Sequence, residues 1–351
     1  MEEKTPEKAE QKSPAGKPPE KPDEKKSADL PAEKKLVVSS SPHFLTDENI
    51  PKIMHNVILA LIPAMGFAVY FFGLRALLLI VVCLFFSLLS EFAMQRIRMK
   101  PVKIYDGSAA ITGILLALTL PPDFPVYGAA LGSIFAIVVG KMLFGGLGYN
   151  IFNPALIGRA FLQATYPVLI TTWAEPRTIA KAVDAVSAAT PLALMKFEGH
   201  ATPVMDLFFG NVAGSLGETS VIAILIGGLF LRYKGYINWK LPLGYLGSMA
   251  FFGLIFWLYD PSHYGSPLFH IFAGGAMLGA WFMVTDMVTS PVTPLGQWIF
   301  ALSAGMLAVI IRNFGGLPEG VMYSILFMNA FVPLINRHTR PKIFGEGYAV
   351  K

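Results

Sequence analysis

The sequence predicts an all-α integral membrane protein with about ten transmembrane helices, arranged as two inverted repeats that contain short broken helices. Of its 351 residues, 54% are hydrophobic and only 15% are charged, which is too apolar for an ordinary soluble protein. The apolar residues form runs of about 20, the helical length that crosses a hydrocarbon core of roughly 30 Å. A glycine motif also recurs in the two halves of the chain.

The chain opens with a polar tail. Residues 1–36 are mainly Lys, Glu, Pro and Ala, with almost no large apolar side chains. Such a segment buries too little surface to offset its ordering entropy, so we expect a disordered cytoplasmic tail. It has neither the apolar core nor the cleavage site of a signal peptide.

Two membrane repeats follow, at 37–170 and 219–336, with a polar loop at 171–218 between them and a C-terminal tail at 337–351. One predicted helix is short because it ends at Pro121-Pro122, and proline ends helices. The predicted spans are 53–72, 74–94, 108–120, 126–143, 151–170, 219–231, 240–259, 266–285, 296–311 and 319–335.

The distribution of lysine and arginine predicts the orientation, because short cationic loops stay in the cytoplasm. With the N-terminus inside, the outer segments hold fewer cations, and the loop 171–218 lies outside with both termini in the cytoplasm. The inner set is Arg96, Arg98, Lys100, Lys103, Lys141, Arg232, Lys234, Lys240, Arg337, Arg340, Lys342 and Lys351, and the outer set is Arg75, Arg177, Lys181, Lys196 and Arg312.

The repeat is visible as Phe144-Gly-Gly-Leu147, which recurs as Phe314-Gly-Gly-Leu317. In the same frame, Thr119 and Pro121 align with Thr289 and Pro291. About five helices separate equivalent points, so the copies have opposite orientation, as in transporter folds whose broken helices meet at the bilayer midplane. The alternative is that Gly-Gly merely marks a helix turn.

The loop contains Asp184-Ala-Val-Ser187-Ala-Ala-Thr190-Pro191. Thr190 is a good N-cap and Pro191 a good first residue for a short helix over 192–197. The same helix end would stabilise a phosphate ester on Thr190, because free amides and the positive dipole end favour an anion. Both interpretations stay open from the residues alone.

Three other acidic positions call for an interpretation. Ser215 and Glu218 are typical of a capping box that opens the helix 219–231, and on the outer face this helix end would also help to hold a phosphate. Asp286 is a candidate for ion or proton traffic beside a broken helix, or a solvated residue at the cytoplasmic end. We expect Glu91 to snorkel or to pair with Arg96.

Several classes of function are excluded. The single Cys83 cannot form an internal disulfide or hold an iron–sulfur cluster alone, so a redox cofactor is organic or shared with another chain. The six histidines lack metal-ligand spacing. No phosphate-binding loop, dinucleotide motif or nucleophile triad is present, and no basic stripe indicates nucleic acid. We therefore predict no catalytic residues, no metal and no NAD site in this chain.

The loop motif resembles the site at which a flavin transferase links FMN through its phosphate to threonine, with Ala188 where glycine is usual. The rest of the chain resembles the D subunit of Rnf-type ion-translocating ferredoxin–NAD(+) oxidoreductases and, more distantly, the B subunit of the Na(+)-translocating NADH–quinone reductase. The matching segments are Ser41-Pro42-His43, Asp106-Gly107-Ser108, Gly145–Gly148, Asn150–Ala155, Gly210–Ser220, Ala273–Ala276 and Thr285–Pro291.

The resemblance implies a membrane electron carrier with covalent FMN on Thr190, in the motif of Asp184, Ser187 and Ala189. It also implies non-covalent riboflavin nearer the cytoplasm, with Asn150 and Asn153 as candidate contacts; their alternative role is turn and N-cap. Implied partners are two small membrane subunits, a flavin-bearing extracytoplasmic subunit, cytoplasmic NAD and iron–sulfur subunits and a flavin transferase, in a bacterial inner membrane. The competing hypotheses are a cofactor-free channel or transporter and a passive scaffold.

Overall fold

The computed structural model describes residues 48–176, 187–218 and 220–341, and it gives no account of the side chains of Ser187 and Ala188. The chain divides into two units, 1–47 and 48–351, and the fold below is that of the second unit. The predicted disordered tail, the Ser41-Pro42-His43 segment, Asp184 and residues 342–351 lie outside the described residues.

The elements of the first half are helical. They are α1 (Ile50–Phe72), α2 (Leu74–Ile97), the 3-10 helix η1 (Ile104–Asp106), α3 (Ser108–Leu118), α4 (Val126–Ile137) with its π-helical continuation η2 (Val138–Met142), α5 (Pro154–Thr165) and α6 (Pro167–Thr171).

The loop and the second half are also mainly helical. The loop contains β1 (Trp173–Ala174), β2 (Ser187–Ala188), α7 (Pro191–Ala193) with its π-helical continuation η3 (Leu194–Glu198), and α8 (Val204–Phe209). The second half contains α9 (Val221–Tyr233), α10 (Lys240–Tyr259), α11 (Pro267–Phe272), α12 (Ala276–Leu278) with the π-helix η4 (Gly279–Met283), α13 (Pro294–Phe314) and α14 (Val321–His338).

Each of the ten apolar segments expected from the sequence is helical. Four helices, α1, α2, α10 and α13, are long and apolar enough to cross a membrane by length and composition. Ser108–Leu118, Val126–Met142 and Val221–Tyr233 are apolar but shorter. Two expected spans are interrupted: 151–170 changes direction at Tyr166, which ends α5, and 266–285 breaks between α11 and α12.

The break at Ala273–Gly275 has a local cause. Gly274 has a φ of 64°, a left-handed conformation that side chains with a Cβ rarely adopt. The side chain of Leu192, from α7, fills the space beside it, because a Cβ on Gly274 would lie 2.7 Å from Leu192 Cδ1. The helix therefore stops where another segment packs against its backbone.

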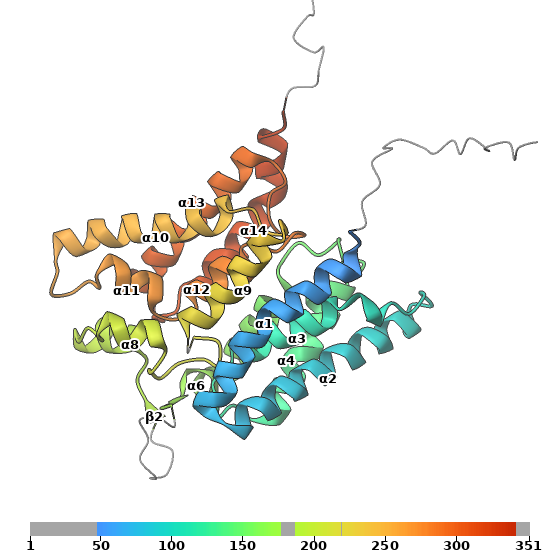
Figure 1. Cartoon of the computed structure of the whole chain (residues 1–351), viewed down its shortest axis with the longest axis horizontal. Coiled ribbons are helices and arrows are strands. Elements are labelled where there is room, and N and C mark those ends of the chain that lie inside the picture. The colour runs from blue at the N-terminus through green and yellow to red at the C-terminus, as the bar shows by residue number, and fades with distance from the viewer. Residues whose placement is uncertain (1–47, 177–186, 219, 342–351) are drawn as a thin grey trace, which may run out of the picture. The chain divides into compact units, whose positions relative to one another are not determined.

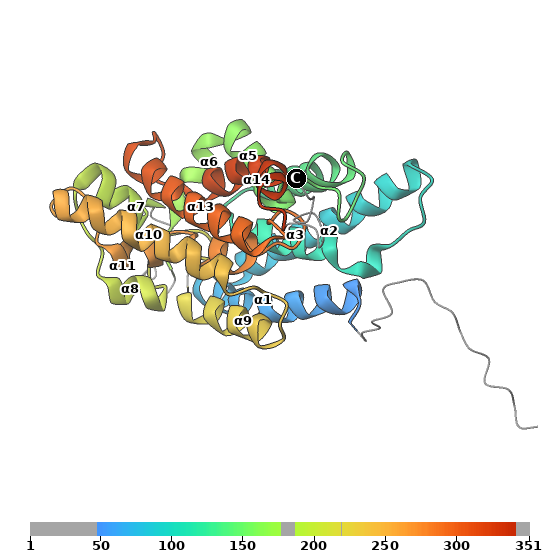
Figure 2. The same cartoon turned by 90° about the horizontal axis from the view of Figure 1, so that it is seen from above.

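Helices of the first half pack mainly on one another, with α2 against α3 and α4, and those of the second half likewise, with α10 against α13 (Figures 1 and 2). Contacts of α1 with α9 and of α5 with α14 join the halves. The largest hydrophobic core runs through both halves, from Ala60 to Ile335. The large apolar side chains left exposed on α1, α2 and α10 suit a lipid environment.

Candidate functional site

Thr190 caps a short helix, as the sequence predicts. Ser187 and Ala188 pair antiparallel with Trp173 and Ala174, which fixes the backbone just before it. Its side chain is 3% exposed, and Oγ1 accepts a hydrogen bond from the backbone N–H of Ala193 at 3.2 Å. The helix runs on through η3 to Glu198, one residue beyond the expected end.

Two contacts hold this short helix on the second half of the chain. Leu192 packs on Gly274 at the break between α11 and α12. Lys196 Nζ donates to the carbonyl oxygen of Arg312 at 2.7 Å and to that of Gly315, at the C-terminal end of α13. Desolvation lowers the pKa of the Lys196 amine. The Thr190 segment is therefore anchored, although it lies in a loop.

A polar cavity lies between the two halves, next to this helix. We call it the seam cavity; its lining includes Arg159, Gln163, Ser215, Glu218, Arg312 and Glu319. Arg159, on α5, forms an ion pair with Glu319 and donates to the carbonyl of Thr119, at the end of α3, at 2.9 Å. Four charged side chains in one cavity are unusual for membrane-spanning sequence, where such groups are expensive and mark functional regions.

Arg312 holds the break in the second half. Its Nη1 donates to the carbonyl of His270 at 2.6 Å and its Nη2 to that of Ala273 at 2.8 Å. These carbonyls end α11 and would otherwise lack partners. The cation distribution in the sequence assigns Arg312 to the outer loop ends, but its side chain is 3% exposed.

The predicted capping box at Ser215 and Glu218 is wrong. Helix α9 begins at Val221, and its cap is Ser220, whose Oγ accepts from the N–H of Ala223 at 3.3 Å. Glu218 does accept from the N–H of Ser215 at 3.2 Å, but this contact closes a turn that lies before the helix. Both residues instead line the seam cavity.

A larger cavity, with a volume of about 100 Å³, lies at the other end of α3. Its lining includes Lys141, Asn150, Asn153, Trp281 and Asp286, among mostly apolar side chains. A mostly apolar lining with a few polar groups is typical of cofactor sites. The structure therefore brings Asp286 and the two predicted asparagines into one cavity, which we call the large cavity.

The asparagines also have the structural roles that the sequence left open. Asn153 caps α5, because its Oδ1 accepts from the N–H groups of Ala155 at 3.1 Å and Leu156 at 3.4 Å. Asn150 donates to the carbonyl of Phe152 at 3.2 Å. By contrast, the indole N–H of Trp281 has no hydrogen-bond partner among the described residues. Trp281, which lines the large cavity, therefore carries an unused donor.

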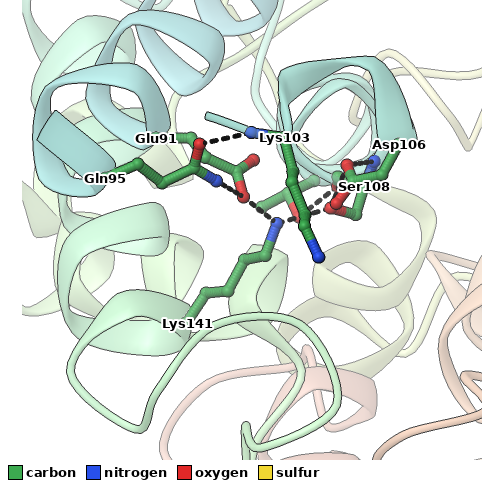
Figure 3. Close-up of polar contacts among 7 residues, drawn as sticks. Glu91, Gln95, Lys103, Asp106, Ser108 and Lys141 are labelled. Atoms are coloured by element: carbon green, nitrogen blue, oxygen red, sulfur yellow. Dashed lines mark hydrogen bonds and ion pairs between the residues drawn. The ribbon is translucent and has the colours of Figure 1, made fainter. Parts of the chain in front are cut away.

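Lys141, which lines the large cavity, forms a buried ion pair with Glu91 (Figure 3). Lys141 Nζ lies 2.7 Å from Glu91 Oε1, and the two side chains are 2% and 1% exposed. Lys141 also donates to Ser108 Oγ at 2.5 Å, and Ser108 donates to Asp106 at 2.8 Å. The expected pairing of Glu91 with Arg96 is therefore wrong, and Lys141 is not a solvated loop cation.

Asp286 lies in the turn after η4. Its carboxylate accepts from the N–H of Val288 at 3.2 Å and from Thr289 Oγ1 at 3.0 Å, so it stabilises that turn. It also lines the large cavity. These hydrogen bonds give Asp286 a structural role in the turn, while its place at the cytoplasmic end and its role in ion traffic stay predictions.

The two cavities are separated by the length of one short helix. Ser108, at the start of α3, lines the large cavity, and Thr119, just after its end, lines the seam cavity. Eleven residues of α-helix span roughly 16 Å. The segment 275–288 also lines both cavities, so the broken helices of both halves run from one to the other.

The roles of Lys141, Arg159, Gln163 and Glu319 were not predicted from the sequence. Lys141, Arg159 and Glu319 share one signal in the sequence, because each is an ionisable side chain inside or beside an apolar run. Such a residue is a candidate functional residue by default. The cation distribution instead places Lys141 at a cytoplasmic loop end. Nothing in the spacing of Arg159 and Glu319 indicates that they pair.

The NQR2, RnfD, RnfE family model matches residues 37–345. The chain belongs to this family. It is 47% identical to the D subunit of the proton-translocating ferredoxin:NAD(+) oxidoreductase complex of Clostridium ljungdahlii, over 88% of this chain and 96% of the relative. It is 46% identical to the D subunit of the Na(+)-translocating ferredoxin:NAD(+) oxidoreductase complex of Acetobacterium woodii, over 89% and 96%. The D subunit of the ion-translocating oxidoreductase complex of Cronobacter sakazakii is 37% identical, over 88% and 99%.

Proposed function

We propose that this chain is the D subunit of an ion-translocating ferredoxin:NAD(+) oxidoreductase complex, with FMN linked to Thr190 through its phosphate. The observation that carries the proposal is the position of Thr190, at the cap of a helix anchored beside the seam cavity. The names of the family relatives support the complex. The residues around Thr190 are suited to hold the phosphate.

A phosphate ester at Thr190 leaves the local structure usable. The ester oxygen remains an acceptor for the Ala193 N–H, so the cap survives. The first-turn amides and the positive end of the helix dipole favour an anion there. Cationic Lys196 lies on the same short helix and Arg312 beside it. These groups would hold the phosphate close to the outer surface.

We propose that the large cavity holds a second flavin, without a phosphate, and riboflavin is the flavin of that description. The ring would lie among apolar side chains and Trp281, with Asn150 and the free indole N–H as polar partners. Lys141, whose charge faces Glu91, and Asp286 are the charged groups in the described lining. This set offers no uncommitted cation for a phosphate, which selects against FMN.

Flavins at the two places would supply electron transfer, and the chain would carry electrons between an extracytoplasmic flavin subunit and the cytoplasmic side. The short broken helices between the cavities fit such a relay. In this proposal the two halves are inverted repeats, both termini are cytoplasmic, and Thr190 lies outside. The relay would be coupled to translocation of Na⁺ or H⁺, since relatives carry both names. Two small membrane subunits and the NAD and iron–sulfur subunits complete the proposed complex in a bacterial inner membrane.

In-gel flavin fluorescence tests the proposal directly. The full chain is expressed with a flavin transferase, denatured and separated on a gel. We expect a fluorescent band in the wild type and in Thr172→Ala, which removes a hydroxyl from the same loop, and no fluorescence in Thr190→Ala. A colourless wild-type chain that conducts ions or solutes by itself in liposomes would instead establish the channel hypothesis.

A further inference from the structure

The hydroxyl of Thr190 is enclosed in the folded chain. Thr190 is 3% exposed, and its Oγ1 accepts a hydrogen bond from the Ala193 N–H at 3.2 Å, whereas the preceding residue, Ala189, is exposed. A transferase that forms a phosphate ester must bring a base within about 2.6–3.2 Å of this hydroxyl and place a phosphorus atom in line with it. An enzyme active site does not reach a side chain that is buried to this extent. The packed conformation is therefore not the one that is modified.

A few side chains hold residues 190–198, which include α7 and η3 and which we call the attachment segment, on the rest of the protein. Leu192 and Met195 are 5% and 6% exposed. Lys196 Nζ donates to the carbonyl oxygens of Arg312 and Gly315. The apolar pair packs in a small hydrophobic cluster with Leu207, Phe269 and Ala273. Because this cluster is separate from the main core, the segment can be released while the main core stays packed.

The two ends of the attachment segment allow it to move as a unit. Before it, β2 is two residues long and pairs with β1, which is equally short. After it, Gly199 has a φ of 66°, a left-handed conformation that glycine adopts without steric cost. A Cβ at Gly199 would meet only the Ser262 carbonyl oxygen, at 3.9 Å. Small residues with few contacts at the ends of elements are suited to act as hinges.

We propose that the attachment segment undocks to present Thr190 to the flavin transferase and docks again after modification. The inference rests on the proposed attachment of FMN at Thr190. Local opening of a small, separately packed unit is a common route by which buried groups become accessible. Leu192 and Lys196 hold the closed form, and they therefore set the rate of modification, because only the open fraction of the chain is a substrate.

The reaction of the open form transfers a phosphate ester without a change of oxidation state. The donor is a flavin dinucleotide, whose pyrophosphate joins FMN to a nucleoside monophosphate. Thr190 Oγ1 attacks the phosphorus of the FMN half, and the new Oγ1–P bond replaces a P–O bond of the pyrophosphate. The nucleoside monophosphate leaves, and the hydroxyl proton passes to a base of the transferase. The ester oxygen can again accept from the Ala193 N–H when the segment docks.

Thiol labelling of the unmodified full chain in detergent measures the opening without any flavin. Met195→Cys places a thiol on the buried side of the attachment segment, and Phe197→Cys replaces a side chain that is 68% exposed on the same segment. We expect Met195→Cys to react slowly with a maleimide. Adding Lys196→Met should speed this reaction at least about tenfold, because hydrogen bonds to a charged group are worth that factor or more. Phe197→Cys should react equally fast with and without Lys196→Met, and the native Cys83 is 0% exposed.

The rate of modification is measured on full chains that carry no labelling cysteine, made without the transferase and then mixed with transferase and flavin dinucleotide. Covalent in-gel fluorescence should appear about tenfold faster in Lys196→Met than in the wild type. It should also appear faster in Leu192→Ala, which weakens the docking through packing rather than through charge. Lys240→Met is the matched control, because Lys240 is half-buried like Lys196 and lies at the start of α10, outside the attachment segment.

The outcomes separate the two proposals. Faster labelling of Met195→Cys in the presence of Lys196→Met, with faster modification of both Lys196→Met and Leu192→Ala but not of Lys240→Met, supports the inference. Modification of both anchor variants at the wild-type rate overturns it and leaves the attachment at Thr190 intact, as does Met195→Cys that reacts as fast as Phe197→Cys in the otherwise wild-type chain. Absence of covalent flavin from every chain overturns the attachment, and the modification step with it, whatever the labelling shows.

Discussion

Arg159 and Asn329 make the same kind of contact in the two halves of the chain, 170 residues apart. Arg159 donates to the carbonyl of Thr119 at 2.9 Å. Asn329, in the amide orientation that satisfies both of its neighbours, donates to the carbonyl of Thr289 at 3.2 Å. Thr119 and Thr289 are also 170 residues apart, in the frame in which the glycine motif repeats. These two equivalent contacts support the proposed repeat independently of the glycine motif.

Arg159 is expected to be essential for stability. Arg159→Met leaves Glu319 without its ion-pair partner and the Thr119 carbonyl without its donor, and breaking such a pair typically costs about 3–5 kcal/mol. Unfolding of the purified chain in detergent measures the loss. Adding Glu319→Gln to this variant removes the uncompensated charge and should restore much of the stability. Equal stability of wild type and Arg159→Met would contradict the pairing.

The Lys141–Glu91 pair gives a second stability prediction. Glu91→Gln leaves a buried ammonium without its counter-charge, with only a neutral amide oxygen at position 91 and Ser108 Oγ as acceptors, and a loss of about 3–5 kcal/mol is expected for an uncompensated buried charge. Lys141→Met combined with Glu91→Gln should recover most of it. Arg96→Gln is the control, because the Arg96 side chain lies over the Phe92 ring and outside this cluster. A large effect of the control alone would favour the pairing expected from the sequence.

The large cavity should bind a flavin that denaturation releases. Ile111→Trp places an indole in the lining, so we expect the released flavin to disappear while the covalent fluorescence stays. Chromatography and mass spectrometry of the extract identify the ligand. Release of FMN in place of a phosphate-free flavin would count against the charge argument, and release of any flavin from the filled cavity would count against its location.

Cysteine labelling in intact cells tests the orientation. The native Cys83 is 0% exposed and should not react. A cysteine at exposed His200, in the loop that carries Thr190, should react with a membrane-impermeant maleimide. A cysteine at Tyr105, which is 88% exposed between α2 and α3, should react only after lysis. The reverse pattern would place Thr190 on the cytoplasmic side.

The helices could be predicted from the sequence because hydropathy and proline are local signals. The α3 end before Pro121 and the cap at Thr190 follow from a few neighbouring residues. The seam cavity could not be predicted, since Arg159 and Glu319 are 160 residues apart and only the packing of α5 on α14 brings them together. Ser215 shows that a local pattern can also mislead. The Ser215–Glu218 spacing predicts a helix cap, but the cap of α9 is Ser220, five residues further on.

The proposed function depends most directly on the chemistry at Thr190, and Thr190→Asn isolates it. Asparagine caps a helix as well as threonine does, so the short helix and its anchoring should remain, but no hydroxyl is left to form a phosphate ester. In-gel fluorescence of the denatured chain, with mass mapping of the peptide that contains residue 190, makes the measurement. We predict flavin on that peptide in the wild type and none in Thr190→Asn. Equal covalent fluorescence in the two chains, or flavin mapped to another peptide, would contradict the attachment.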